Sequence, residues 1–292
     1  MTISQTAPAP APAAAPQAGA PPRWRLLTRK PTFLVGAAIL LFWVVCAIAG
    51  NAIAPDSPLA QSLLATNAAP SAAHWFGTDQ LGRDVLARVL VGSRDILIIT
   101  PLATVLGTVC GTALGLAMGY FGGVLDLVGS RIVEAVLALP AVIIAFLFIV
   151  ALGPSTVTLI IVIGFIFTPL IARTVRAAVL AERHLDYLPA ARLLGAGAWS
   201  VMVMEILPNV LPAVLVEFSV RLGYAIFTVA TLSFLGFGIQ PPTPDWGSDI
   251  AANYGVLAAG YWWETLFPAL AIASLIIAIN LITDSLEQVM AS

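Results

Sequence analysis

The feature that most constrains this chain is a long uncharged stretch, because residues 135–172 contain no Asp, Glu, Lys or Arg. A helix needs about 20 apolar residues to cross a bilayer, so this stretch is too long for one span. Gly153, Pro154 and Ser155 interrupt it with residues typical of a turn. We therefore predict two membrane-spanning helices here, at about 135–152 and 156–175.

The rest of the chain shares this apolar character, since 60% of all residues are hydrophobic and only 10% are charged. Soluble domains are about 25% charged. The composition predicts an all-α polytopic membrane protein embedded in the lipid bilayer. The net charge of −2 gives no indication of a nucleic-acid partner, because in membrane proteins the placement of Lys and Arg matters more than their sum.

The N-terminal region divides into a tail and a first span. Residues 1–30 are rich in Ala and Pro and are predicted to form a disordered cytoplasmic tail that ends in a cluster of basic residues. An uncharged run then follows at 33–50. A signal peptide cleaved after Ala47-Ile48-Ala49 is the alternative, but the run is long enough to cross most of a bilayer, so we favour a retained first span. Residues 31–92 are predicted to hold this span and an extracytoplasmic loop.

Six membrane-spanning helices are predicted in total, the others lying at about 96–120, 209–236 and 264–282 within a core domain of residues 93–292. Arginines gather before Pro208, which marks the loop at 180–208 as cytoplasmic by the positive-inside rule. Both termini are then cytoplasmic. These arginines are Arg173, Arg176, Arg183 and Arg192.

The first outer loop conflicts with this orientation because it contains Arg83, Arg88 and Arg94. The apolar spacing of residues 81–90 predicts an amphipathic helix that lies on the membrane face. His74, near two aspartates, raises the alternative of a metal site. A single His without a second nitrogen or sulfur ligand is weak evidence, so a structural loop is favoured and no metal is predicted.

Two features inside the spans predict contacts. Glycines recur at every fourth position of the second span, which leaves a smooth helix face for close packing against a neighbour. Glu217 and Arg221 are four residues apart in the fifth span, in the order that favours an ion pair. The pair either neutralises itself at a helix interface or lines a substrate path. The glycines are Gly107, Gly111, Gly115 and Gly119.

The semi-polar stretch 186–209 is predicted to hold a short helix with small residues, Ala190, Ala191 and Gly195, that another protein can grip. Four segments, FGTDQLGRDVLARVLVGSRD, LPAARLLGAGAWSVMVMEILPN, LSFLGFGIQPPTPDWG and WWETLFPALAIASLIIAINLITDSLE, resemble the C-type permease subunits of dipeptide, oligopeptide and nickel ABC importers. The resemblance covers the chain from about residue 31 onwards.

The resemblance implies a type I ABC importer permease fold in a bacterial inner membrane. Its implied partners are a homologous B-type permease, which forms a heterodimer with this chain, two cytoplasmic ATPase subunits and an external solute-binding protein. It also implies a coupling helix that docks on an ATPase. The matching positions are Ala190, Ala191, Gly195, Leu207 and Pro208, whereas Pro189 stands where the family usually has Glu. Pro fits the first turn of a helix, so the docking helix is expected to begin at or near Pro189.

No catalytic residue and no resident cofactor are predicted in this chain. It lacks a Gly-Lys phosphate loop, so ATP and Mg²⁺ are expected on the partner subunits. The predicted cargo is di- or oligopeptides, with nickel chelates or another small solute as the alternative. An ion-coupled secondary transporter is a rival class, but it has thin support in Glu217 and Arg221 and no visible internal repeat. A membrane-embedded enzyme is disfavoured because both His residues lie outside the spans.

Overall fold

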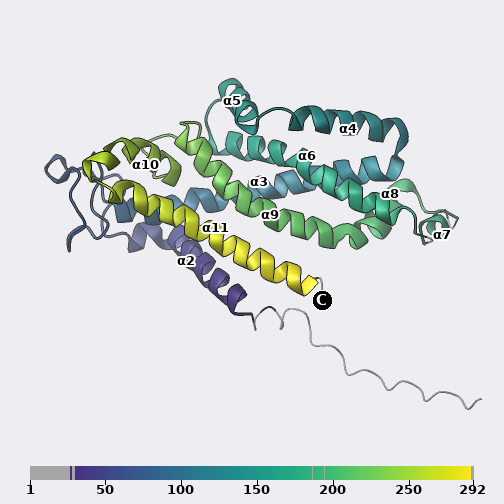
Figure 1. The fold of residues 1–292 in the computed structure, drawn as a ribbon, viewed down its shortest axis with the longest axis horizontal. Coiled ribbons are helices and arrows are strands. Elements are labelled where there is room, and N and C mark those ends of the chain that lie inside the picture. Colours follow the sequence, from purple (N-terminus) through teal and green to yellow (C-terminus); the bar gives the residue numbers. More distant parts are fainter. Residues whose placement is uncertain (1–26, 28–29, 186, 194, 291–292) are drawn as a thin grey trace, which may run out of the picture.

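The computed structural model describes residues 27, 30–185, 187–193 and 195–290. Within this part of the chain all regular elements are helical (Figure 1). Five helices are long and apolar enough to cross a membrane, and a bent helix pair brings the number of spans to six. The all-α fold is therefore confirmed, and the number of spans is the predicted six when the bent pair is counted as one. Of the predicted disordered tail, only residues 27 and 30 are among the described residues.

Helix α2 (Pro31–Ile53) is the first span and begins with Pro at its first position, where no backbone N–H is needed. It packs against α11 (Trp263–Met290) and α3 (Val85–Phe121). The Trp43 indole donates to Ser274 Oγ at 2.9 Å. A Cβ atom at Gly36 would lie 2.8 Å from the carbonyl oxygen of Ala278, so this glycine allows α2 and α11 to approach closely.

The second span starts earlier than predicted, because α3 is one continuous helix from Val85 to Phe121. The predicted amphipathic helix on the membrane face is wrong, and the predicted domain boundary between residues 92 and 93 falls inside α3. Asp84 caps α3 by accepting a hydrogen bond from the Ala87 backbone N–H at 2.7 Å. The side chains in its first turns are mostly buried inside the protein, so these turns do not form a separate helix with one open face.

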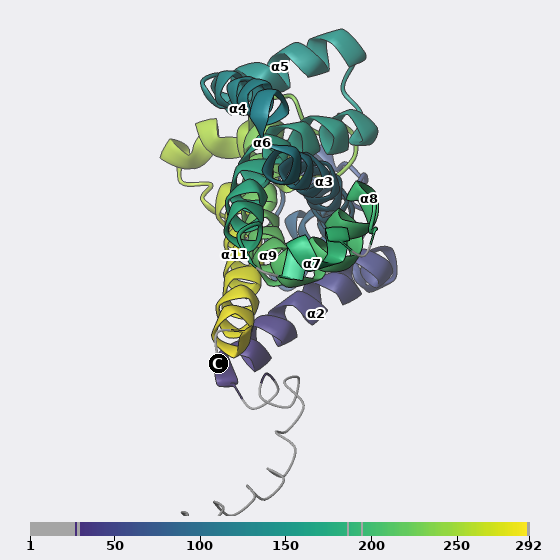
Figure 2. The same ribbon diagram turned by 90° about the vertical axis from the view of Figure 1, so that its right-hand side faces the viewer.

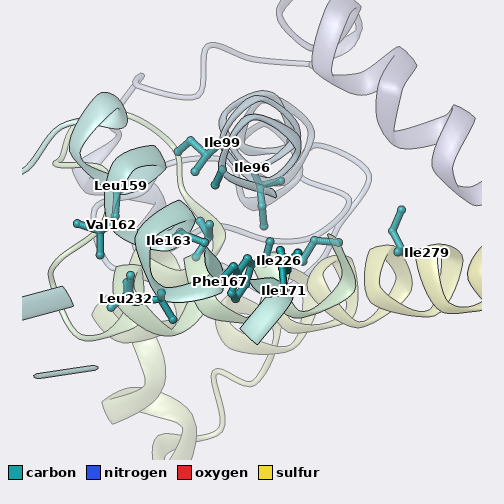
Figure 3. Packing of buried hydrophobic residues seen from close by; sticks show 14 of the residues in the cluster. Ile96, Ile99, Leu159, Val162, Ile163, Phe167, Ile171, Ile226, Leu232 and Ile279 are labelled. Atoms are coloured by element: carbon teal, nitrogen blue, oxygen red, sulfur yellow. The ribbon is translucent and has the colours of Figure 1, made fainter. Parts of the chain in front are cut away.

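Helix α6 (Thr156–Glu182) packs along most of α3 through the predicted glycine face. A Cβ atom added to Gly111 would lie 2.7 Å from Ile171 Cβ, and one added to Gly115 would lie 2.7 Å from the carbonyl oxygen of Ala172. Gly107 and Gly119 contact α6 in the same way. The buried aliphatic residues of α3, α6, α9 and α11 meet beside this contact (Figure 3). The structure thus places all four glycines where the sequence predicts close packing.

The third span is broken. Helices α4 (Gly123–Leu137) and α5 (Ala141–Leu152) bend by 89° around Pro140, so the prediction of one straight helix over 135–152 is wrong. Pro140 has no N–H and disfavours a helical conformation in the residue before it. Asp126 of α4 pairs with Arg176 of α6, with Nη2 donating to Oδ2 at 2.7 Å. Both views place α4 and α5 on the side of the bundle away from α2 (Figure 2).

The remaining elements define two ends of the bundle, which we call the α10 end and the α7 end (Figure 1). The short helix α7 (Tyr187–Leu193) stands at one end, followed by α8 (Ala198–Ser200), the π-helical segment η2 (Val201–Ile206) and α9 (Leu207–Phe234). At the other end lie α10 (Trp246–Asn253) and the 3₁₀ segments η1 (Leu63–Ala65) and η3 (Tyr254–Ala259).

Candidate functional site

The candidate coupling element is α7 with the segments that flank it. Helix α7 begins at Tyr187, so Pro189 lies within its first turn, as the sequence predicts. The Pro189 side chain is exposed, and Leu193 at the end of the helix is 89% exposed. Ala190 and Ala191 belong to the same helix. Pro189 and Leu193 thus give this short helix an exposed apolar surface at the end of the bundle.

Tyr187 anchors α7 to two long helices. Its hydroxyl donates to Glu182 Oε2 at 2.7 Å, at the end of α6, and accepts from Asn209 Nδ2 at 3.0 Å, in the first turn of α9. Burial and the hydrogen bond to the Glu182 carboxylate raise the pKa of Tyr187, so the hydroxyl stays protonated and keeps donating. Leu188 is fully buried beneath it. Tyr187 thus ties α7 to the end of α6 and to the first turn of α9.

Large apolar side chains surround α7 without being covered. Trp199 of α8 is 75% exposed, and Leu185, just before α7, is 47% exposed. Exposed clusters of large apolar residues at a protein end that also carries polar groups are typical of protein–protein contacts. This surface, together with Leu193, is suited to a protein partner.

The position of Gly195 in the structure differs from the predicted one. It does not lie on the helix beside Ala190 and Ala191, but two residues beyond the end of α7, with φ +86°. An added Cβ atom would meet no atom within 4 Å, so the position requires glycine for its left-handed backbone and not for close packing within this chain. Gly197, the N-cap of α8, has an ordinary φ of −70°.

Residues 198–234 form one uninterrupted helical rod from the α7 end to the α10 end. Leu207 and Pro208 start α9, directly after the π-helical turns of η2. Val201 and Ile206 are fully buried and seat these turns on the core. In π-helical turns each hydrogen bond spans five residues and not four, and such turns often occur at functional positions. The helical geometry of the rod therefore changes at η2, directly before α9.

Glu217 and Arg221 form the ion pair that their spacing predicts, with Nε donating to Oε1 at 2.7 Å. The Arg221 guanidinium also lies 5.5 Å from the centre of the Tyr224 ring. Beside the pair, α9 and α11 enclose a groove of about 370 Å³. Four polar residues line this groove from α11 beside the apolar Ile276, and sequence reasoning missed them; they are Asn280, Thr283, Asp284 and Glu287.

The α10 end holds a cluster of buried charges. Arg88 of α3 pairs with Asp249 of α10, with Nε donating to Oδ1 at 3.0 Å, and Arg83 Nε donates to Asp79 Oδ2 at 2.6 Å. His74 Nδ1 lies 2.8 Å from Asp84 Oδ2, which fits the structural loop that was favoured over a metal site. The outer arginines that conflict with the positive-inside rule are thus mostly neutralised inside the protein.

Comparison with known proteins identifies the family to which this chain belongs. Residues 111–292 match the family described as the binding-protein-dependent transport system inner membrane component. Residues 23–70 match the N-terminal transmembrane domain of oligopeptide transport permease C. The chain belongs to the family of binding-protein-dependent transport permeases. The resemblance to C-type permeases is thereby confirmed.

Relatives in this family match nearly the whole chain. The dipeptide transport system permease protein DppC of Escherichia coli K12 is 40% identical, over 91% of this chain and 90% of the relative. The protein of the same name from Bacillus subtilis 168 is 36% identical, over 91% and 83%. A putative peptide transport system permease protein of Brucella suis is 38% identical, over 91% and 89%. These relatives are transport permeases and not enzymes.

Proposed function

We propose that this chain is one permease subunit of an ATP-driven importer that carries di- or oligopeptides across a bacterial inner membrane. The names of its relatives support the cargo, since several are dipeptide or peptide permeases that match about nine-tenths of the chain. The observation that carries the proposal is the anchored helix α7, which leaves an uncovered apolar surface at one end of a six-span bundle.

The α7 end faces the cytoplasm in this proposal. Arg173, Arg176 and Arg183 gather at the end of α6, which supports this orientation by the positive-inside rule. Lys30 at the start of α2 donates to Gln288 Oε1 near the end of α11, at 2.8 Å, so the described chain starts and ends on one side of the bundle. Both termini are then cytoplasmic, and α10 faces the external solute-binding protein.

The proposed complex consists of this chain, a homologous B-type permease and two cytoplasmic ATPase subunits. ATP and Mg²⁺ bind to the ATPases, and this chain contributes no catalytic group. The coupling surface comprises Pro189, Ala190, Ala191, Gly195, Leu207 and Pro208. When the ATPases close, α7 moves with them, and its ties to α6 and α9 transmit a rigid-body displacement along the rod to the α10 end.

Replacing Gly195 tests the coupling role. In Gly195→Ala the left-handed backbone is strained by about 1–2 kcal/mol, so the turn after α7 relaxes and the docking surface is displaced. We expect peptide-stimulated ATP hydrolysis and transport to fall several-fold, while insertion and complex formation persist. Gly197→Ala is the matched control, because its φ of −70° suits alanine and an added Cβ is free of contacts. Equal loss in both variants, or in neither, contradicts the role assigned to Gly195.

The translocation path is proposed to run along the polar groove between α9 and α11, with Glu217 and Arg221 at its edge. A peptide backbone needs hydrogen-bond partners inside the membrane, and the groove supplies the side chains of Asn280 and Asp284. Because Glu217 and Arg221 neutralise each other, we expect the double variant Glu217→Gln, Arg221→Met to keep most of the transport rate. Glu217→Gln alone is expected to lose more, since it leaves Arg221 unpaired. Complete loss in the double variant would place the pair inside the path.

Reconstitution tests the function as a whole. The complex with its binding protein is placed in liposomes, and ATP hydrolysis is measured with dipeptides, longer peptides or a nickel chelate. Stimulation by peptides supports the proposal, and stimulation by nickel chelates alone identifies the alternative cargo. If this chain transports a solute by itself, driven by an ion gradient and without a bound ATPase, the importer assignment fails.

A further inference from the structure

A cavity of about 640 Å³ lies between α2, α3, α9 and α11, on the side of α2 that is not packed tightly. Leu40, Val44, Ala47 and Ile48 line it from α2. These positions share one helix face, because residues four, seven and eight apart in a helix lie above one another. The packed face of α2 is a different one, formed by Gly36, Trp43, Cys46 and Gly50.

The cavity reaches from the α10 end of α2 towards the middle of the membrane. Leu40 and Ile48 are eight residues apart, which corresponds to a depth of about 12 Å along the helix axis. Ile48 lies near the end of α2 at Ile53 and is 82% exposed. The volume falls within the range of roughly 300 to 1,000 Å³ that is usual for sites of small organic ligands.

Among the described residues that line this cavity, Arg94 of α3 is the one with a charge. Its side chain is exposed, and within the described part of the chain no carboxylate lies within ion-pair distance of it. Asp95 is its nearest acidic neighbour in sequence and interacts with it only over a longer range. Arg83 and Arg88 on the same side of the molecule are both paired. Arg94 therefore offers an unsatisfied positive charge to a ligand.

The lining decides what kind of ligand fits. Besides Arg94, the only polar side chain in the wall is Thr100, and its hydroxyl already donates to the carbonyl oxygen of Ile96 at 2.7 Å. A peptide in this cavity would leave its backbone N–H and C=O groups without partners, which costs several kcal/mol in an apolar site. A hydrocarbon chain has no such groups. One anionic headgroup with an attached acyl chain satisfies both parts of the site.

We propose that this cavity binds one anionic phospholipid from the leaflet nearer the α10 end. The phosphate lies on the Arg94 guanidinium, whose planar donors suit phosphate oxygens, and one acyl chain extends along α2 towards Leu40. The lipid fills the space between α2 and the other three helices. It thereby supports α2 on the face where the protein itself makes few contacts, and it is independent of the cargo.

The test uses the purified transport complex in nanodiscs of phosphatidylglycerol and phosphatidylethanolamine, followed by native mass spectrometry of the lipid that remains bound. We expect Arg94→Gln to lower the apparent affinity for phosphatidylglycerol by about tenfold, as the loss of a charge-assisted hydrogen bond predicts. Arg94→Lys keeps the charge and should retain part of the binding. Arg131→Gln is the control, because Arg131 is 74% exposed and pairs with Glu134 outside this cavity.

A second variant tests the acyl chain. Ala47→Trp fills the groove but leaves Arg94 in place, so it should release the lipid, whereas a free phosphate ion on Arg94 would be retained. Equal retention of phosphatidylglycerol in wild type and Arg94→Gln overturns the proposal. It is also overturned if a cysteine at Ile48 cross-links to the partner permease, or if a transported peptide protects that cysteine from a thiol reagent.

Discussion

Gly111→Leu is expected to prevent stable assembly of this permease. A Cβ atom at this position would lie 2.7 Å from Ile171 Cβ and 2.8 Å from the carbonyl oxygen of Thr168, and leucine adds three further carbon atoms. The backbone of α6 cannot give way locally, so α3 and α6 must separate along their shared face. Overpacking of this kind costs about 3 kcal/mol or more, and inside lipid no hydrophobic effect restores the contact.

The expected readout for Gly111→Leu is loss of the complex from detergent extracts, measured by size-exclusion chromatography with the partner permease. Ala113→Leu is the matched control. It lies two residues away on the same helix, but its side chain is exposed. Leucine is tolerated there because it points away from α6. If both variants assemble like the wild type, the α3–α6 contact is not the one that holds the bundle together.

This glycine face was predictable because its signal is local. Four glycines at intervals of four define one side of one helix, whatever surrounds it. The uncharged run and its Gly153-Pro154-Ser155 break were predictable for the same reason. The bend between α4 and α5 was missed, although Pro140 marks it, because a proline inside an apolar run is compatible with either a kinked or a broken span.

The long-range contacts were not predictable from spacing alone. Arg88 looked like an exposed charge on an amphipathic segment, since its partner Asp249 lies in α10, more than a hundred residues away. A signal was nevertheless present: the loop after the fifth span has acidic residues and no Lys or Arg, which complements the basic residues of the first outer loop. Matching the charges of loops on one side of the membrane would have identified the pair.

The coupling element was likewise only partly predictable from the sequence. Its place in the chain, the helix around Pro189 and the small residues were all predictable from the sequence and its resemblance to relatives. The role of Gly195 was not, because a glycine that allows close packing and a glycine that allows a left-handed backbone look the same in sequence. Only its φ of +86° and the empty space around it separate the two.

Arg88→Met is expected to destabilise the α10 end by about 3–5 kcal/mol, because it leaves Asp249 buried without a counter-charge. Arg88 also donates to the carbonyl oxygens of Pro58 and Pro242, so it joins the first outer loop, α3 and the segment before α10. The measurement is the midpoint of thermal unfolding of the purified complex. Arg131→Met removes an exposed pair and should change stability by less than about 1 kcal/mol.

The pH dependence of Arg88→Met separates a charge effect from lost packing. Burial already raises the pKa of Asp249 above its ordinary value of 3.8, and the Arg88 charge opposes that rise. Without Arg88 the pKa rises further, so the folded state binds a proton that the unfolded state releases at neutral pH. Stability of the variant must then increase as pH falls towards the ordinary Asp value. The double variant Arg88→Met, Asp249→Leu lacks the Asp249 carboxyl, so we expect it to recover most of the lost stability and to lose the pH dependence that Arg88→Met adds. Asp245 and Glu264 stay buried in both variants and act as a common background. A double variant as unstable as the single one would mean that the hydrogen bonds to Pro58 and Pro242, and not the ion pair, hold this end together.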